Sequence, residues 1–195
     1  MTDATNSKTD TVSRNMLMAH SRVPRGISIT NEKLSESVIS SIADFYGSSE
    51  ILSYYSYSPP FMLDTASIVE RIVREALKET LTKLHNLLAL DAGWNGYDAL
   101  APNADAVAHA EDWLVRLFLE VADLGRMWMK PNVIADAEGE VVFEWWYGTK
   151  KLTVYIAEQS AEYVQVWGKD IHSEMSDGNA EPTSMCRSLW LWLTS

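Results

Sequence analysis

The stretch PNVIADAEGEVVFEWWYGTKKLTVYIAEQSAEYVQVWGKD, residues 131–170, decides the fold. Apolar and polar residues alternate along it, and turn-forming residues separate the alternating runs, which is the pattern of an antiparallel meander. We expect three or four strands, at residues 132–136, 140–147, 151–157 and 161–167. The turns between them fall at Glu138-Gly139, Gly148-Thr149 and Glu158-Gln159-Ser160.

The second of these strands has one strongly apolar face. Because side chains alternate along a strand, one face carries Val141, Phe143, Trp145 and Tyr147, and the other carries Val142, Glu144 and Trp146. An apolar sheet face requires a second layer, and the nearest candidates are the helices that precede it in the chain.

Helical periodicity precedes the strands in two long segments, residues 65–90 and 104–124. The apolar stripe expected for the first helix is Ile68, Ile72, Leu77, Leu81, Leu84 and Leu88. In the second helix Asn103 is expected as the N-cap, and Gly125 is expected to end the helix.

The C-terminal part of the chain is expected to be a polar loop and a short helix. The loop is HSEMSDGNAEP, residues 172–182, and the helix follows with Thr183 as its cap. Three apolar side chains of this helix, Leu189, Trp190 and Leu193, should dock on the body of the domain.

Together these elements predict an α+β protein, in which two long antiparallel helices pack on an antiparallel meander of three or four strands. Residues 1–30 are polar and are expected to form a flexible arm. Residues 31–64 are expected to hold a helix at 31–46 and a Tyr-rich extended segment. Residues 65–195 form the α+β core domain.

Between the two long helices lies GWNGYDALAP, residues 93–102, a short break rich in glycine and aromatic residues. Glycine permits left-handed backbone positions, and Asn-Gly is a strong turn pair. We favour a structural corner, in which Trp94 and Tyr97 pack over the helix junction. The alternative is a ligand pocket formed by Trp94, Asn95, Tyr97 and Asp98.

Few residues carry a recognisable chemistry. The sequence holds no phosphate-binding loop, dinucleotide fingerprint, zinc-protease motif or nucleophile elbow. His85, Asp98 and His109 are weak catalytic candidates, because an antiparallel helix pair can bring His85 and His109 together with Asp91 or Asp98. Cys186 beside Arg187 is either a reactive thiol of lowered pKa or, as we favour, a buried inert one. No metal site or cofactor is expected.

Two further segments have the composition of a binding surface. The Tyr-rich segment carries Tyr54, Tyr55 and Tyr57, which provide contact area at low entropic cost, although we favour an extended cover over the core. On the polar face of the sheet, Glu140 and Glu144 form an acidic row with Glu138 at the turn.

The segments LDAGWNGYDALAPNADAVAHAEDWLVRL and PNVIADAEGEVVFEWWYGTKKLTVYI together resemble a set of small bacterial and phage-borne proteins. Their pattern is Gly-Trp-Asp-Gly-Tyr-Gly-Ala-x-Pro, followed by a helix, a Pro-led strand, an Asp-Gly turn and a strand ending in Leu-Glu-Trp. The resemblance covers residues 84–165 and departs at Asn95, Asp98 and Glu138. It implies the architecture and a bacterial or phage origin, and it assigns no catalytic residue.

Charge and composition limit the partners and the location that we expect for the protein. The formal net charge is −11, and residues 91–195 hold seventeen acidic and seven basic side chains. Such a surface repels a phosphate backbone, so direct nucleic-acid binding by the body is not expected. It suits a basic partner, such as a nucleic-acid-binding protein, although composition alone favours an acidity that only maintains solubility. The chain is expected to be cytoplasmic for three reasons. It shows no apolar run long enough for a membrane span and no signal-peptide pattern, and it contains one cysteine.

These observations favour a non-catalytic protein-interaction module that binds a protein partner, or a second copy in a homodimer, through acidic and aromatic surface. We expect an accessory or inhibitory protein of a mobile-element, defence or counter-defence system. The alternatives are a hydrolase or nuclease-like enzyme with a His/Asp cluster around residues 85–109, and a small-ligand sensor with a pocket at Trp94 and Tyr97.

Overall fold

A computed structural model describes residues 65–170 and 172–195. The arm expected at residues 1–30, the helix at 31–46 and the Tyr-rich segment with Tyr54, Tyr55 and Tyr57 lie outside the described residues. The described chain contains two long helices, a five-stranded sheet and a C-terminal helix, so the α+β class is confirmed.

The sheet is an antiparallel meander with the strands in chain order. Its strands are β1 (Asn132–Ala135), β2 (Val141–Tyr147), β3 (Lys150–Ile156), β4 (Ala161–Val166) and β5 (Met175–Asn179). The four expected strands are confirmed to within one residue at each end. Gly139 and Gly148 occupy two of the expected turns with φ of 81° and 60°, which is backbone that glycine adopts without strain.

The fifth strand is a correction, since residues 172–182 were expected to be a loop. The sequence of β5, MSDGN, contains no β-branched or aromatic residue, so its composition gives no strand signal. Pairing with β4 overrides this weak propensity. Gly178 has a specific role there, because a Cβ at this position would lie 3.0 Å from the hydroxyl of Tyr163 on β4.

The two long helices are α3 (Thr65–Asn86) and α4 (Ala104–Asp123), and a 3-10 turn, η2 (Leu87–Ala89), follows α3. The side chain of Asn103 accepts a hydrogen bond from the backbone N–H of Asp105, so the expected N-cap is confirmed. Gly125 ends α4 with φ of 58°, also as expected. The buried apolar residues of α3 are Val69, Val73, Leu77, Leu81, Leu84 and, in η2, Leu87, and the expected Ile72 is partly buried against them. Leu88, expected in the core, is exposed.

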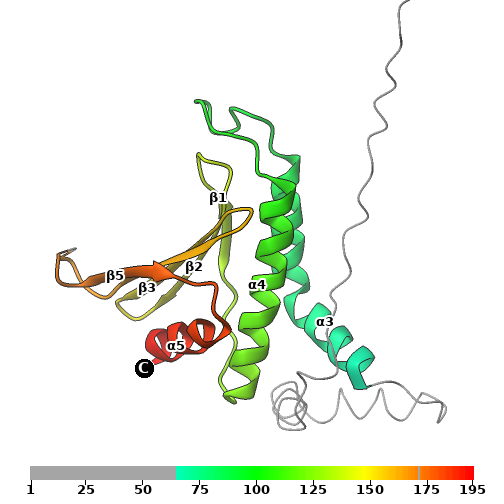
Figure 1. Cartoon of the computed structure of the whole chain (residues 1–195), viewed down its shortest axis with the longest axis vertical. Helices are drawn as coiled ribbons and strands as arrows, with labels where there is room; N and C mark the ends of the chain where they lie inside the picture. Colours follow the sequence, from blue (N-terminus) through cyan, green and yellow to red (C-terminus); the bar gives the residue numbers. More distant parts are fainter. Residues whose placement is uncertain (1–64, 171) are drawn as a thin grey trace, which may run out of the picture.

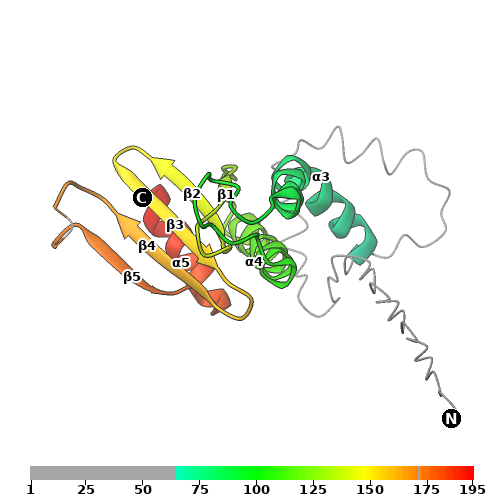
Figure 2. The same cartoon turned by 90° about the horizontal axis from the view of Figure 1, so that it is seen from above.

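The C-terminal helix α5 (Thr183–Thr194) lies on the same face of the sheet as α4, and α3 lies on the outer side of α4 (Figures 1 and 2). Thr183 is the first residue of this helix, which follows directly on Pro182 without a side-chain cap, so the expected capping role is wrong. Leu189, Trp190 and Leu193 are buried as expected.

An aromatic cluster joins these layers. Trp113 of α4 is fully buried, and its ring lies against Phe143 and Trp145 of β2, with centroids 6.1 and 6.3 Å away. Trp145 contacts Trp190 of α5 edge to face, and Trp190 stacks on Trp128. The indole N–H of Trp113 donates to the carbonyl of Ala180, between β5 and α5, at 2.9 Å.

We expect Trp113→Ala to lower the free energy of unfolding by about 3–5 kcal/mol, because it removes a large buried aromatic side chain and leaves a cavity. It also leaves the Ala180 carbonyl without its donor. Trp146→Ala is the matched control, since Trp146 lies on the face of the sheet opposite the one that packs on α4 and α5 and is 54% exposed. This control should cost less than about 1 kcal/mol. Urea denaturation followed by circular dichroism measures both, and equal losses would contradict the assigned core.

Candidate protein-interaction surface

The loop between α3 and α4, residues 91–102, is called the corner loop below. Hydrogen bonds to its own backbone hold it in shape. The N–H of Gly93 donates to the carbonyl of Ala99 at 2.7 Å and closes the loop at its base. Gly93 and Gly96 have φ of 78° and 81°, and the N–H of Gly96 donates to the carbonyl of Gly93. The side chain of Asn95 accepts from the backbone N–H of Tyr97 at 2.9 Å. These bonds define one loop conformation without any buried large side chain.

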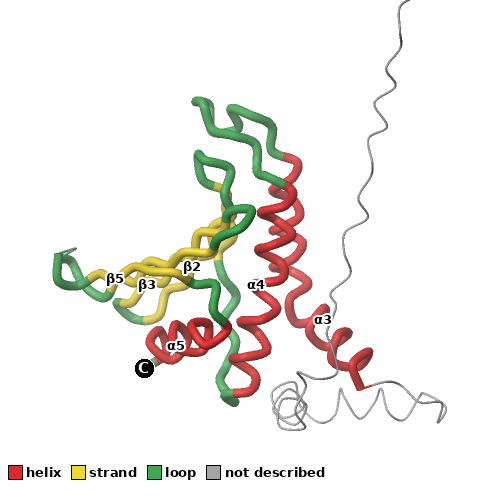
Figure 3. The backbone as a smooth tube through the Cα atoms, viewed as in Figure 1, coloured by secondary structure: helices red, strands yellow, loops and turns green. Residues whose placement is uncertain are grey.

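The corner loop is fastened to the turn between β1 and β2, residues 136–140. The backbone N–H of Leu100 donates to the carbonyl of Ala137 at 2.8 Å, and that of Asn103 donates to Gly139 at 3.3 Å. Gly139 has positive φ, and a Cβ there would lie 2.8 Å from the carbonyl oxygen of Ala101. Glycine is therefore required by both conformation and close approach. The loop and the turn lie together at one end of the molecule, above the sheet in Figure 3.

The large side chains of the corner loop are exposed to solvent. Tyr97 is 82% exposed, Leu100 is 58% exposed and Trp94 is 38% exposed. The indole N–H of Trp94 donates to the carbonyl of Leu100 at 3.2 Å, which fixes the ring beside Leu100. The expectation that Trp94 and Tyr97 pack over the helix junction is therefore wrong. A closed pocket walled by Tyr97 is equally inconsistent with so exposed a phenol ring.

The turn carries an acidic cluster. The side chain of Asp136 accepts hydrogen bonds from the backbone N–H groups of Glu138 and Glu140, which holds the turn closed. The pKa of Glu140 is raised, first by partial burial and then by the charges of Asp136, Glu138 and Glu162. These three carboxylates therefore stand close enough to oppose the ionisation of Glu140.

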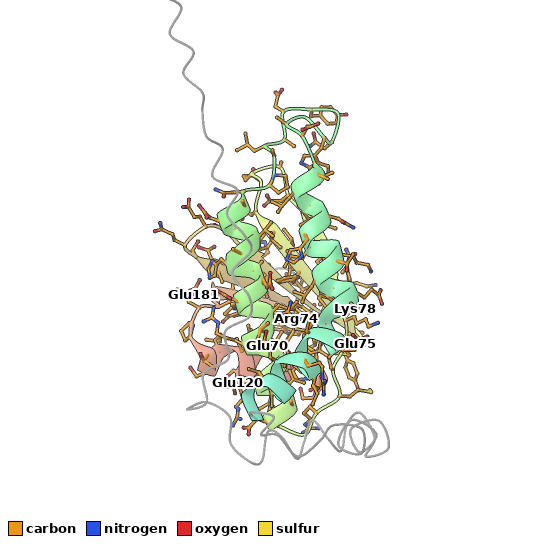
Figure 4. The ribbon with its side chains drawn as sticks, turned by 90° about the vertical axis from the view of Figure 1, so that its right-hand side faces the viewer. Glu70, Arg74, Glu75, Lys78, Glu120 and Glu181 are labelled. Atoms are coloured by element: carbon orange, nitrogen blue, oxygen red, sulfur yellow. The ribbon has the colours of Figure 1, made fainter. Side chains whose placement is uncertain are left out.

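The charges of α3 are arranged differently. Glu70 pairs with Arg74 at 2.9 Å, and Glu75 pairs with Lys78 at 3.4 Å, along the solvent face of the helix (Figure 4). Within the described residues, the carboxylates of Asp136, Glu138, Glu140 and Glu162 have no lysine or arginine at ion-pair distance. The acidic turn is therefore an uncompensated negative site beside the exposed loop.

Of the acidic row expected on the sheet, only part belongs to this site. Glu144 lies on the outer face as expected, but its carboxylate is 2.5 Å from the ammonium group of Lys151 and accepts a hydrogen bond from Asn132. Its charge is compensated. Asp98 is exposed on the corner loop. We define the aromatic–acidic surface as Trp94, Tyr97 and Leu100 on the loop with Asp136, Glu138, Glu140 and Glu162 on the sheet end.

The histidine candidates are not brought together. His85 lies 2.8 Å from the carboxylate of Glu111 and so links α3 to α4. His109 bonds the carbonyl of Ala157 at 2.9 Å through Nδ1, and its Nε2 lies 3.0 Å from Glu181. Neither histidine contacts Asp91 or Asp98. Among the described residues no group of three His, Cys, Asp or Glu side chains is arranged to hold a metal ion.

Cys186 is a buried side chain of α5 rather than a reactive thiol. Burial raises its pKa to about 11, and the lowering by Arg116 does not offset this. The neighbouring Arg187 pairs with Glu120 and Asp123 of α4. The inert alternative is therefore the one that the structure favours.

Sequence reasoning missed Leu100, Asp136 and Glu162 as members of this surface. Leu100 reads as an ordinary apolar residue, and only its exposure distinguishes it. The pairing of Asp136 with two backbone N–H groups had a local signal, since Asp is a common first residue of a turn and Gly139 follows three residues later. No local sequence signal pointed to Glu162, because its proximity to Glu140 depends on the register of three strands.

No protein-family model matches the chain, and no curated protein or solved structure shows significant similarity to it. Across the described residues, no helix combines the length and the apolar character that a membrane crossing requires.

Gly139→Ala and Gly96→Ala form a matched pair of substitutions at the loop and the turn. Both place a Cβ on backbone with φ of +81°, but only the first meets an atom, the Ala101 carbonyl oxygen. Gly96→Ala should cost about 1–2 kcal/mol of conformational strain, and Gly139→Ala should cost more. Hydrogen exchange at the Leu100 amide should accelerate only in Gly139→Ala. Equal exchange rates in the two variants would show that loop and turn are not coupled.

The single thiol allows a chemical test of the core. Since the pKa of Cys186 is about 11, iodoacetamide at pH 8 should label the native protein far more slowly than the urea-unfolded chain. The raised pKa also sets a sign for stability: its contribution is complete below the unfolded thiol pKa and is lost as the pH rises through about 11. Cys186→Ala should remove this alkaline decline in the free energy of unfolding. Fast labelling of the native chain would place the thiol at the surface.

Proposed function

We propose that the protein is a non-catalytic interaction module, which binds a basic segment of a partner protein on the aromatic–acidic surface. The observation that carries the proposal is the display of Tyr97, Leu100 and Trp94 on a loop whose backbone is bonded to the acidic turn. Loops positioned by a rigid scaffold are common binding elements.

The two halves of this surface have complementary roles. Tyrosine and tryptophan are enriched among the residues that dominate interface energies, and a fixed loop reduces the entropy lost when they bind. The uncompensated carboxylates of the turn attract a cationic partner over distances comparable with the Debye length, and so they accelerate association. The partner chemistry that fits is a segment with lysine or arginine next to an apolar side chain.

Photo-crosslinking in the host cell identifies the partner and tests its place of contact. A benzoylphenylalanine at position 97 should capture the partner, and the same group at position 147 should not. Tyr147 is a suitable control because it is also an exposed tyrosine and lies at the β2–β3 hairpin, away from the loop. Capture from position 147 but not from 97 would contradict the proposal.

With the partner in hand, Tyr97→Ala should weaken its affinity by at least tenfold, as expected for a central aromatic contact. Its free energy of unfolding should change by less than about 0.5 kcal/mol, because Tyr97 is almost fully exposed. Glu138→Lys should slow association and reduce its dependence on salt, whereas Glu75→Lys on α3 should leave both unchanged. Biolayer interferometry at two salt concentrations measures these rates. Partner binding that is insensitive to Tyr97→Ala and Glu138→Lys would refute the assignment.

The raised pKa of Glu140 adds a pH dependence with a defined sign. As the pH is lowered, Glu140 takes up a proton at a higher pH than an ordinary glutamate, so the attraction for a basic partner declines earlier. In Glu140→Gln the association rate should be lower at neutral pH and should lack this early decline. The cellular setting expected for such a module is an accessory or inhibitory role in a mobile-element, defence or counter-defence system. It stays a prediction that the identity of the captured partner tests.

A further inference from the structure

Strand β5 forms one edge of the sheet. The strand order places it at the end of the meander, and only β4 pairs with it among the described residues. In Figure 2 it runs along the margin of the sheet that lies away from α3 and α4. An edge strand presents unpaired backbone N–H and C=O groups, which are the groups that an additional strand would bind.

The pairing with β4 determines which groups these are. Trp167 donates its N–H to the carbonyl of Glu174, and Ala180 donates to the carbonyl of Ala161. Because hydrogen-bonded and outward residues alternate along an antiparallel edge, Ser176 and Gly178 face β4. The backbone groups of Met175, Asp177 and Asn179 therefore face away from the sheet.

The edge is regular and is not closed by the usual steric devices. All five residues of β5 pair with β4 without a bulge, and the strand contains no proline. Tyr163 lies against Gly178 from the neighbouring strand, which leaves no room for a side chain there and holds the edge close to β4. The charge of Asp177, which is exposed at the centre of the strand, is the feature that opposes unspecific strand pairing at this edge.

That charge determines which strand can be added. Two copies of β5 paired about a twofold axis at Asp177 would place two carboxylates directly opposite each other, which is destabilising. Glu162 on the same face of β4 lies diagonal to Asp177 and adds a second negative charge. At one end of the edge, Met175 pairs with Val166, which makes that end apolar.

We propose that β5 accepts an additional antiparallel strand from a partner protein, in which a lysine or arginine lies opposite Asp177. In the antiparallel direction, the residue two positions after this basic residue lies opposite Met175 and should be apolar. The residue two positions before it lies opposite Asn179 and should be polar. This surface is distinct from the aromatic–acidic surface, and either assignment can fail without the other.

The test uses the full chain and blocked peptides of sequence Thr-Thr-Thr-X-Thr-Val-Thr, in which X is Lys, Ala or Glu. Amide hydrogen exchange by NMR should show peptide-dependent protection at Met175, Asp177 and Asn179. The amides of Ser176 and Gly178 should change little, because they already face β4. The Lys peptide should bind about three- to tenfold more tightly than the Glu peptide.

Two variants of the edge complete the test. Asp177→Lys should reverse the preference between the Lys and Glu peptides. Asp177→Pro should abolish binding, since it removes an outward N–H while sparing the ladder with β4. Protection that favours neither charge, or that is absent at millimolar peptide, would overturn the proposal. Protection that grows with protein concentration in the absence of peptide would identify a second copy as the occupant and would also overturn it.

Discussion

The rest of the structure depends on the contacts of the Trp113 indole, which are one hydrogen bond and two ring contacts. Its N–H donates to the carbonyl of Ala180, whose own N–H donates to Ala161 at the start of β4. The backbone of one residue is thus bonded through its N–H to strand β4 and through its carbonyl to a buried side chain of α4. This arrangement fixes the end of β5, the entry into α5 and the position of α4 against the sheet. The same ring packs on Phe143 and Trp145, so an apolar contact and a polar contact hold the layers at one point.

Around this point the core is built from large rings. Trp145, Trp190 and Trp128 contact one another in series. Within the described residues the buried indole nitrogens of Trp128 and Trp190 have no hydrogen-bond partner, which costs roughly 1–3 kcal/mol for each group. The area that these rings bury offsets the loss. Because α4 and α5 are both held here, the N-terminal end of α4 is positioned without help from the side chains of the corner loop.

This arrangement explains why the side chains of Tyr97 and Leu100 can be exposed. The loop is fixed by the cap at Asn103, by backbone bonds to the turn at Ala137 and Gly139, and by the close approach of Gly139 to Ala101. Stability in this region comes from backbone groups and glycine, so Tyr97 and Leu100 have no packing function. Exposed apolar side chains on a fixed backbone are the arrangement that a binding surface requires.

Most of the architecture could be predicted from the sequence, because the periodicity of apolar residues indicates which face of a helix or strand is buried. The alternation in VVFEWWY correctly placed Phe143 and Trp145 inward, and the spacing of Leu77, Leu81 and Leu84 correctly placed the stripe of α3. Strand β5 was not predictable in this way, because Asp, Gly and Asn follow tertiary pairing there rather than their own preference. The corner loop was wrongly predicted for a related reason. Trp94 and Tyr97 are residue types that are common in cores, but their exposure depends on where the loop is anchored.

The electrostatics of the acidic turn give the last step of the argument. The pKa of Glu140 is raised in the folded chain, so its contribution to stability is present below the unfolded carboxyl pKa and is lost as the pH rises through the folded value. Where Glu140 is ionised, the fold therefore holds its charge beside Asp136, Glu138 and Glu162 at a cost to its own stability. Asp136 nevertheless keeps the turn closed through two backbone hydrogen bonds. A cationic partner would remove this repulsion on binding, so the same cluster that weakens the free fold would strengthen the complex.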